Sequence, residues 1–135
     1  MKRYIPVFAT LALFAGLTLS ATAGTETDPD SADSARNWDK FSAALVTNIQ
    51  AGHPGVQASA LRHVVYYGDK VDVSDAVFDI VRIYRDNDDE NLRMLALAAL
   101  HKMDNTWAND FIARSIPFEK SDRVKRQSLA VLSAQ

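Results

Sequence analysis

The residues best placed to do chemistry are carboxylates that crowd one polar turn. Asp86, Asp88, Asp89 and Glu90 lie close together in the sequence, and hard cations such as Ca²⁺ prefer clustered carboxylate oxygens. The turn lacks the glycine and the distant glutamate of an EF-hand loop, because a helical pattern starts directly after it at Leu92. Carboxylates before a helix also cap its free N–H groups and favour its dipole. We therefore expect a structural role, and a bound cation stays open as the alternative.

A cluster of basic side chains lies near the C-terminal end of the chain. Lys120, Arg123, Lys125 and Arg126 stand at the start of another helical pattern, where positive charge opposes the helix dipole. We expect this basic turn to lie beside the acidic turn, with Asp89 and Arg123 as the pair that couples them. A patch for an acidic partner is the functional alternative, although charge runs are usually solvated faces.

The remaining reactive side chains do not form a recognisable site. The three histidines, His53, His63 and His101, share no ligand spacing, whereas zinc needs three or four converging ligands. His63 lies on the apolar side of its predicted helix and is expected to be at least half-buried. The chain has no cysteine and no nucleophile elbow, phosphate loop or dinucleotide fingerprint. We predict no catalytic residue, no metal and no cofactor.

The N-terminal segment has the three parts of a secretory signal peptide. Lys2 and Arg3 precede an uncharged apolar run over 5–19, and a small-x-small motif ends at Ala23. The run is short for a membrane span, which needs about 20 residues. We therefore predict cleavage after Ala23 and an exported protein, periplasmic or secreted. An uncleaved anchor is the alternative.

Charge and composition narrow the class of the mature protein. Without Lys2 and Arg3 the 15 basic residues become 13 against 17 acidic ones, a formal charge of −4. This acidity argues against binding of nucleic acid or of an anionic membrane surface. An exported chain without cysteine must be held by its apolar core rather than by disulfides. A mature length of about 110 residues suits one such core.

The chain after the signal segment divides into a polar leader and a helical domain. Residues 24–36 contain no large apolar side chain and are expected to be disordered. From Asn37 to the end, apolar residues recur at helical spacing and no alternation typical of strands is sustained. The aromatic residues Trp38, Phe41, Phe78, Trp107 and Phe111 lie on apolar faces and are expected in the core. The pattern predicts an all-α fold of six helices in three hairpins, near 38–49, 56–67, 77–84, 92–103, 107–112 and 124–132.

The second helices of the three hairpins align with one another. With Val56, Leu92 and Val124 in register, at offsets of about 36 and 32 residues, three further columns coincide. They are a small column, a leucine column and a large apolar column: Ala60, Ala96 and Ser128; Leu61, Leu97 and Leu129; Val64, Leu100 and Leu132.

This pattern resembles the second helix of HEAT-like repeats of the short type found in phycobilin-lyase relatives. The segment 92–100 fits that motif closely, 124–132 fits in part, and 56–64 lacks its basic residue. The resemblance covers the chain from about Trp38 onward. It implies a right-handed α-α superhelix of about three antiparallel hairpins, residues 37–135. An ordinary helical bundle is the alternative, because amphipathic helices share such spacing.

Stacked hairpins commonly present a curved surface that binds proteins or peptides. We therefore expect a non-catalytic module for protein or peptide binding, with contacts from the column Gln57, Arg93 and Lys125. An accessory or lyase-like enzyme component is the first alternative, by analogy with the pigment-lyase relatives. Self-association of a structural protein through an exposed apolar end is the second.

Overall fold

The computed structural model describes residues 29–135, which form six α-helices and two short 3₁₀ turns. The described part of the chain is all-helical, as the sequence predicts, and contains no strand. The helices are α1 (Pro29–Gln50), α2 (Pro54–Tyr67), α3 (Val77–Asp86), α4 (Glu90–Met103), α5 (Thr106–Ser115) and α6 (Asp122–Ser133). The 3₁₀ turns, Ser74–Ala76 and Ile116–Phe118, precede α3 and follow α5. The predicted signal segment and residues 24–28 lie outside the described residues.

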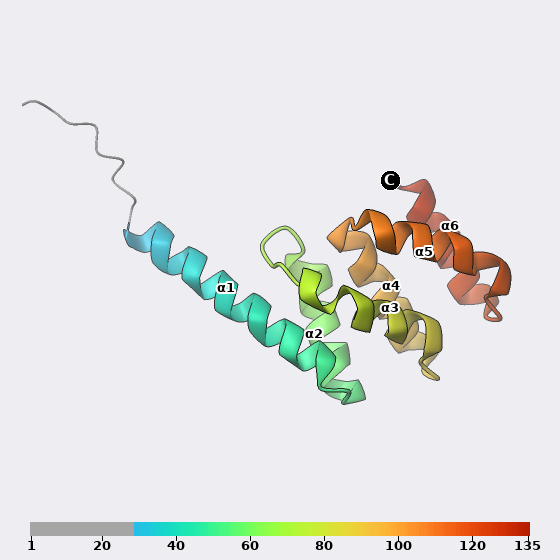
Figure 1. Cartoon of the computed structure of the whole chain (residues 1–135), viewed down its shortest axis with the longest axis horizontal. Helices are drawn as coiled ribbons and strands as arrows, with labels where there is room; N and C mark the ends of the chain where they lie inside the picture. The colour runs from blue at the N-terminus through green and yellow to red at the C-terminus, as the bar shows by residue number, and fades with distance from the viewer. Residues whose placement is uncertain (1–28) are drawn as a thin grey trace, which may run out of the picture.

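The six helices pair into three consecutive hairpins, α1 with α2, α3 with α4, and α5 with α6. The hairpins follow one another along the long axis of the molecule (Figure 1). The second helices form its spine, because α4 packs against both α2 and α6. Short turns join the helices: Gly52 supplies a positive φ of 75° after α1, and Asp104 adopts a left-handed φ of 46° after α4. The core therefore runs continuously from the first hairpin to the third.

Helix α1 begins earlier than the sequence analysis expects. It starts at Pro29, so the stretch 29–36 that was expected to be disordered is helical. Proline is favoured in the first turn of a helix, and acidic side chains there interact favourably with the dipole. Pro29 stands at the first position of α1. The low hydrophobicity of this segment led to the prediction of disorder, although a helix can start at Pro29.

Three of the helix starts depend on side-chain caps. Asp89, Asn105 and Ser121 accept hydrogen bonds from backbone N–H groups near the starts of α4, α5 and α6. Ser74 does not cap α3. Its N–H and hydroxyl both donate to the Asp72 carboxylate, which lowers the pKa of Asp72, and a 3₁₀ turn separates Ser74 from α3.

The aligned columns are buried except at the ends of the row of hairpins. The small column, Ala60, Ala96 and Ser128, is buried in all three hairpins. Val56 is 39% exposed although Leu92 and Val124 are buried, and Leu129 is 51% exposed although Leu61 and Leu97 are buried. The columns of Val56 and Leu129 therefore each lose their cover in one of the outer hairpins of the described chain, where no second helix among the described residues lies against them.

Two of the aromatic residues expected in the core are on the surface instead. Phe78 is 67% exposed and contacts Trp107, which is also exposed; their ring centroids are 4.7 Å apart. The buried face of α3 is already filled by Val77, Ile80 and Tyr84, so Phe78 points away from it. The other three predicted core aromatics, Trp38, Phe41 and Phe111, are half-buried at the edges of the core.

A search of residues 29–135 for a helix with the length and apolarity of a membrane span finds none.

Candidate functional site

The three residues expected to contact a partner take different positions in the fold. Gln57 is only 6% exposed, and its side-chain amide donates a 2.8 Å hydrogen bond to the Ile49 carbonyl oxygen. That carbonyl belongs to the last turn of α1, where backbone acceptors lack intrahelical partners. Gln57 thus supplies a hydrogen-bond donor to the C-terminal end of α1 from inside the hairpin.

Arg93 does the same for the second hairpin. Its Nε donates a 2.7 Å hydrogen bond to the Tyr84 carbonyl oxygen near the end of α3. Its two terminal nitrogens pair with the Glu119 carboxylate in the connection before α6. Arg93 therefore ties together α3, α4 and the third hairpin.

Lys125 occupies the corresponding position in α6 and is half-buried. Within the described residues its side chain makes no recorded ion pair or carbonyl hydrogen bond. The structure thus does not gather Gln57, Arg93 and Lys125 into one exposed patch.

The acidic and basic turns do lie beside each other, through residues other than the expected pair. Asp89 caps its own helix, whereas Arg123 lies 3.4 Å from a Glu90 carboxylate oxygen and 3.1 Å from the Asn91 side-chain oxygen. Glu90 also accepts a hydrogen bond from the Ser121 hydroxyl. The expected contact between the turns is present, and the assignment of Asp89 to it is wrong.

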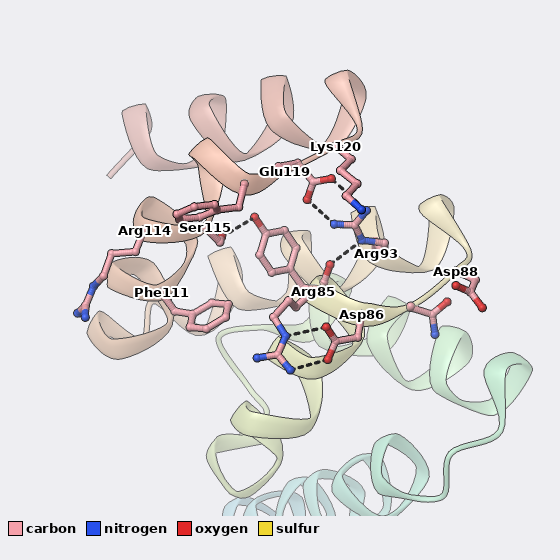
Figure 2. A pocket seen from close by; sticks show the side chains of 12 residues that line it. Arg85, Asp86, Asp88, Arg93, Phe111, Arg114, Ser115, Glu119 and Lys120 are labelled. Carbon is pink, nitrogen blue, oxygen red and sulfur yellow. Dashed lines mark hydrogen bonds and ion pairs between the residues drawn. The ribbon is translucent and has the colours of Figure 1, made fainter.

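A cleft of about 720 Å³ opens between the second and third hairpins, beside these turns. Figure 2 shows its lining, which comes from the C-terminal ends of α3 and α5 and from the segments that follow them. The second helices α4 and α6 pack together behind it. The lining also includes Arg93 of α4, one of the three predicted contact residues, but neither Gln57 nor Lys125.

The floor of the cleft is polar, and its polar side chains are bonded to one another. The side chains of Arg93 and Glu119 are only 14% and 7% exposed. Burial acts to raise the pKa of Glu119, but the hydrogen bonds from Arg93 and from the Ser121 and Lys120 N–H groups outweigh it and hold the pKa below its usual range. Beside this pair, the Tyr84 hydroxyl lies 2.9 Å from the Ser128 hydroxyl. It also lies 3.3 Å from the hydroxyl of Ser115, which Figure 2 labels.

The rim of the cleft combines aromatic surface with cations. Phe118 is 83% exposed, and Phe111 adds a half-buried ring to the lining. Arg114 contacts Asp110 at 3.7 Å with both side chains exposed, and the Lys120 ammonium has no ion pair within the described part of the chain. Arg85 forms a two-pronged hydrogen bond with Asp86, which lowers the pKa of that carboxyl. Apolar surface and positive charge are thus both open to a ligand.

The carboxyls of the lining that have a shifted pKa are held in their charged forms. A general acid or base works best with a pKa near the operating pH. The pKa values of Asp86 and Glu119, by contrast, are shifted downward, and arginines hold both carboxyls ionised. The Ser115 hydroxyl donates a hydrogen bond to the Ile112 carbonyl oxygen.

The remaining candidates lie apart from the cleft. His63 is exposed on α2, which corrects the expectation that it is at least half-buried; within residues 29–135 no further hairpin packs over its side of α2. His101 is half-buried on α4, and His53 is exposed in the turn before α2. Over residues 29–135, no three side chains of His, Asp or Glu converge as metal ligands would. Three of the four carboxylates of the acidic turn have other partners: Asp86 pairs with Arg85, Asp89 accepts from the Asn91 N–H, and Glu90 contacts Ser121 and Arg123.

Sequence reasoning missed the residues that build the cleft, namely Tyr84, Phe118 and Glu119. One signal was available for Phe118, a large apolar residue directly after Pro117 in a connection between helices. Nothing local marks Glu119, because its partner Arg93 is 26 residues away.

Comparison of the chain with protein-family models, with curated proteins and with solved structures finds no match.

Proposed function

We propose that this chain is an exported, non-catalytic module of HEAT-like repeats that binds a protein or peptide partner. Three consecutive hairpins with a shared small column support the repeat assignment, because Ala60, Ala96 and Ser128 occupy equivalent buried positions. The contact of α4 with both α2 and α6 is what a right-handed α-α superhelix requires of its second helices. The signal-like N-terminal segment is the basis for export to the periplasm or beyond.

The observation that carries the binding proposal is that the rim of the cleft exposes an apolar side chain and positively charged side chains next to each other. Phe118 exposes most of its ring, while Lys120 and Arg114 stand beside it on the same rim. Aromatic anchors with neighbouring arginines are typical of residues that dominate binding energy. The ligand that fits is a peptide segment with an apolar side chain followed by a carboxylate. The floor needs no ligand, because Arg93 and Glu119 satisfy each other.

A peptide-display selection tests this proposal. The protein is purified from the exported fraction of an expression host, its N-terminus is established by mass spectrometry, and a random peptide library is selected against it. We expect peptides with an apolar residue next to an acidic one. Phe118→Ser and Lys120→Glu should each weaken the selected peptide about tenfold, which corresponds to about 1.4 kcal/mol.

Leu129→Ser is the matched control, because Leu129 is also an exposed apolar residue and lies outside the cleft. It should leave the affinity unchanged. No enrichment of any peptide, or equal loss in all three variants, would refute the cleft as a peptide site.

A further inference from the structure

Aromatic side chains continue from the cleft across the second and third hairpins. Phe78, near the start of α3, and Trp107, near the start of α5, are 67% and 45% exposed, and their ring centroids lie 4.7 Å apart. Phe111, one turn further along α5, stacks on Trp107 with the centroids 5.9 Å apart. Phe111 also lines the cleft (Figure 2). We call Phe78, Trp107 and Phe111 the aromatic strip; one end of the strip lies in the cleft.

Two contacts show how α3 and α5 lie relative to each other. Near the starts of the two helices, the Phe78 ring contacts the Trp107 ring. Near their ends, the Tyr84 hydroxyl lies 3.3 Å from the Ser115 hydroxyl. The two helices therefore run side by side in the same direction, with the exposed aromatic pair at one end and the cleft at the other.

The aromatic pair lies on the surface although it joins two hairpins. The core beneath it is filled by other side chains, because Ile80 of α3 and Ile112 of α5 are fully buried. Phe78 and Trp107 therefore keep much of their ring area in contact with water. Contiguous exposed apolar surface of this kind is typical of interaction sites, whereas single exposed apolar residues are common everywhere.

The cations that a ligand can reach lie at the cleft end of the strip. Arg114 follows Trp107 by seven residues, which is about two helical turns, so it lies on the same side of α5. Its side chain is 80% exposed, and its 3.7 Å ion pair with the exposed Asp110 is weak. Lys120 has no ion pair among the residues that the structure describes. A ligand laid along the strip thus meets apolar surface at one end and apolar surface with positive charge at the other.

We propose that the peptide bound in the cleft extends along the aromatic strip and places a second apolar side chain on Phe78 and Trp107. This extension rests on the proposed function, because it adds a second contact to the segment that the cleft binds. The distance from Trp107 to Arg114 along α5 is about 10 Å, which an extended peptide covers in about three residues. The recognised segment therefore has two apolar residues about three positions apart, with the acidic residue next to the one in the cleft.

Selection from a random peptide library against the wild-type protein and against Phe78→Ser tests the second contact. The wild type should enrich peptides with two apolar positions at this spacing and an acidic residue beside one of them. Phe78→Ser should enrich only the apolar–acidic pair, because the strip has lost a ring while the cleft is intact. Tyr66→Ser is the matched control, since it removes an exposed aromatic ring of α2, and it should enrich the wild-type pattern. Circular dichroism should show unchanged helicity in both variants.

Fluorescence locates the second contact independently of affinity. The chain has two tryptophans, so Trp38→Phe leaves Trp107 as the only emitter. The peptide selected on the wild type should shift the Trp107 emission to shorter wavelength, because it excludes water from the ring. A shortened peptide that keeps only the apolar–acidic pair should bind about tenfold more weakly and leave the emission unchanged.

The outcomes distinguish failure of the second contact from failure of the cleft. Peptides with a single apolar position, bound equally by the wild type and by Phe78→Ser, would overturn the second contact and leave the cleft as the binding site. Peptides weakened by Phe78→Ser and not by Phe118→Ser would restrict binding to the strip and overturn both the cleft and the extended segment. No enrichment of any peptide would overturn both proposals.

Discussion

Gln57 and Arg93 occupy the same position in successive hairpins, and each donates a hydrogen bond to a carbonyl near the end of the preceding helix. The acceptors are the carbonyl oxygens of Ile49 and Tyr84, at 2.8 and 2.7 Å. The last carbonyls of a helix lack intrahelical partners, so a long polar side chain from the next helix can supply the missing donor. The column thus closes the first two hairpins internally, through an amide in one and a guanidinium in the other.

The first prediction concerns this role of Gln57. Gln57→Ala should lower the free energy of unfolding by about 1–3 kcal/mol, because it leaves the Ile49 carbonyl without a partner. Urea unfolding followed by circular dichroism measures the change. Gln127→Ala, at an exposed glutamine of α6, should change stability by less than about 0.5 kcal/mol. Equal effects of the two substitutions would count against the closing role.

The second prediction concerns acid. The pKa of Glu119 in the folded protein lies below its usual value of 4.5, so the unfolded chain binds more protons between the two values. The stabilisation from Glu119 is therefore complete above about pH 4.5 and is lost as the pH falls through the folded pKa. Glu119→Gln should be less stable than the wild type at neutral pH, and the difference should shrink as the pH falls below 4.5 and through the folded pKa. Urea unfolding at a series of pH values measures it; parallel pH profiles would contradict the shift.

The third prediction separates Asp89 from Glu90. Asp89→Ala should cost about 1 kcal/mol through loss of the α4 cap, whether or not Arg123 is present. Glu90 and Arg123 should show a coupling energy below about 1 kcal/mol that weakens with salt, because both side chains are exposed. Double-mutant cycles at low and high salt measure both couplings. A coupling of Arg123 to Asp89 larger than to Glu90 would disagree with the structure.

The fourth prediction uses the small column to test the Tyr84 hydroxyl. Tyr84→Phe should lower stability by about 1–2 kcal/mol, because it leaves the buried Ser128 hydroxyl without its 2.9 Å partner. Adding Ser128→Ala should recover part of the loss, since alanine fills this column in the other two hairpins. Thermal unfolding of the single and double variants measures the recovery. Tyr66→Phe, at an exposed tyrosine, is the control and should be neutral.

The six helices were predictable because their signals are local. Periodic apolar residues, the caps at Asn105 and Ser121, and the break at Gly52 all act within a few positions of the structure they determine. The start of α1 was missed because low hydrophobicity outweighed its favourable first-turn residues. Register within the second helices was also readable, and the small column is buried as the alignment implies.

Whether each residue of a column is buried or exposed could not be predicted from local signals in the same way. Val56 and Leu129 belong to apolar columns and are nevertheless exposed, because their cover would come from a hairpin on one side only. Gln57 looked like a surface residue because glutamine usually is one. Its burial depends on how α1 ends against α2. The cleft escaped prediction for a similar reason, since Arg93 and Glu119 meet only when two hairpins pack.

The outer face of α6 determines how this architecture can be lengthened, because the exposed Leu129 is flanked there by the polar residues Arg126 and Ser133. A hairpin appended after α6 would meet these three residues and bury little apolar surface beyond Leu129. A hairpin inserted before α5 would meet Leu97 and Met94 on one side and present its own column to Val124 and Val131 on the other. Engineered duplicates of α3 and α4 should therefore be tolerated in the interior of the row and rejected at its C-terminal end. The residues on the outer face of α6 thus favour lengthening by duplication of an internal hairpin over addition of a hairpin after α6.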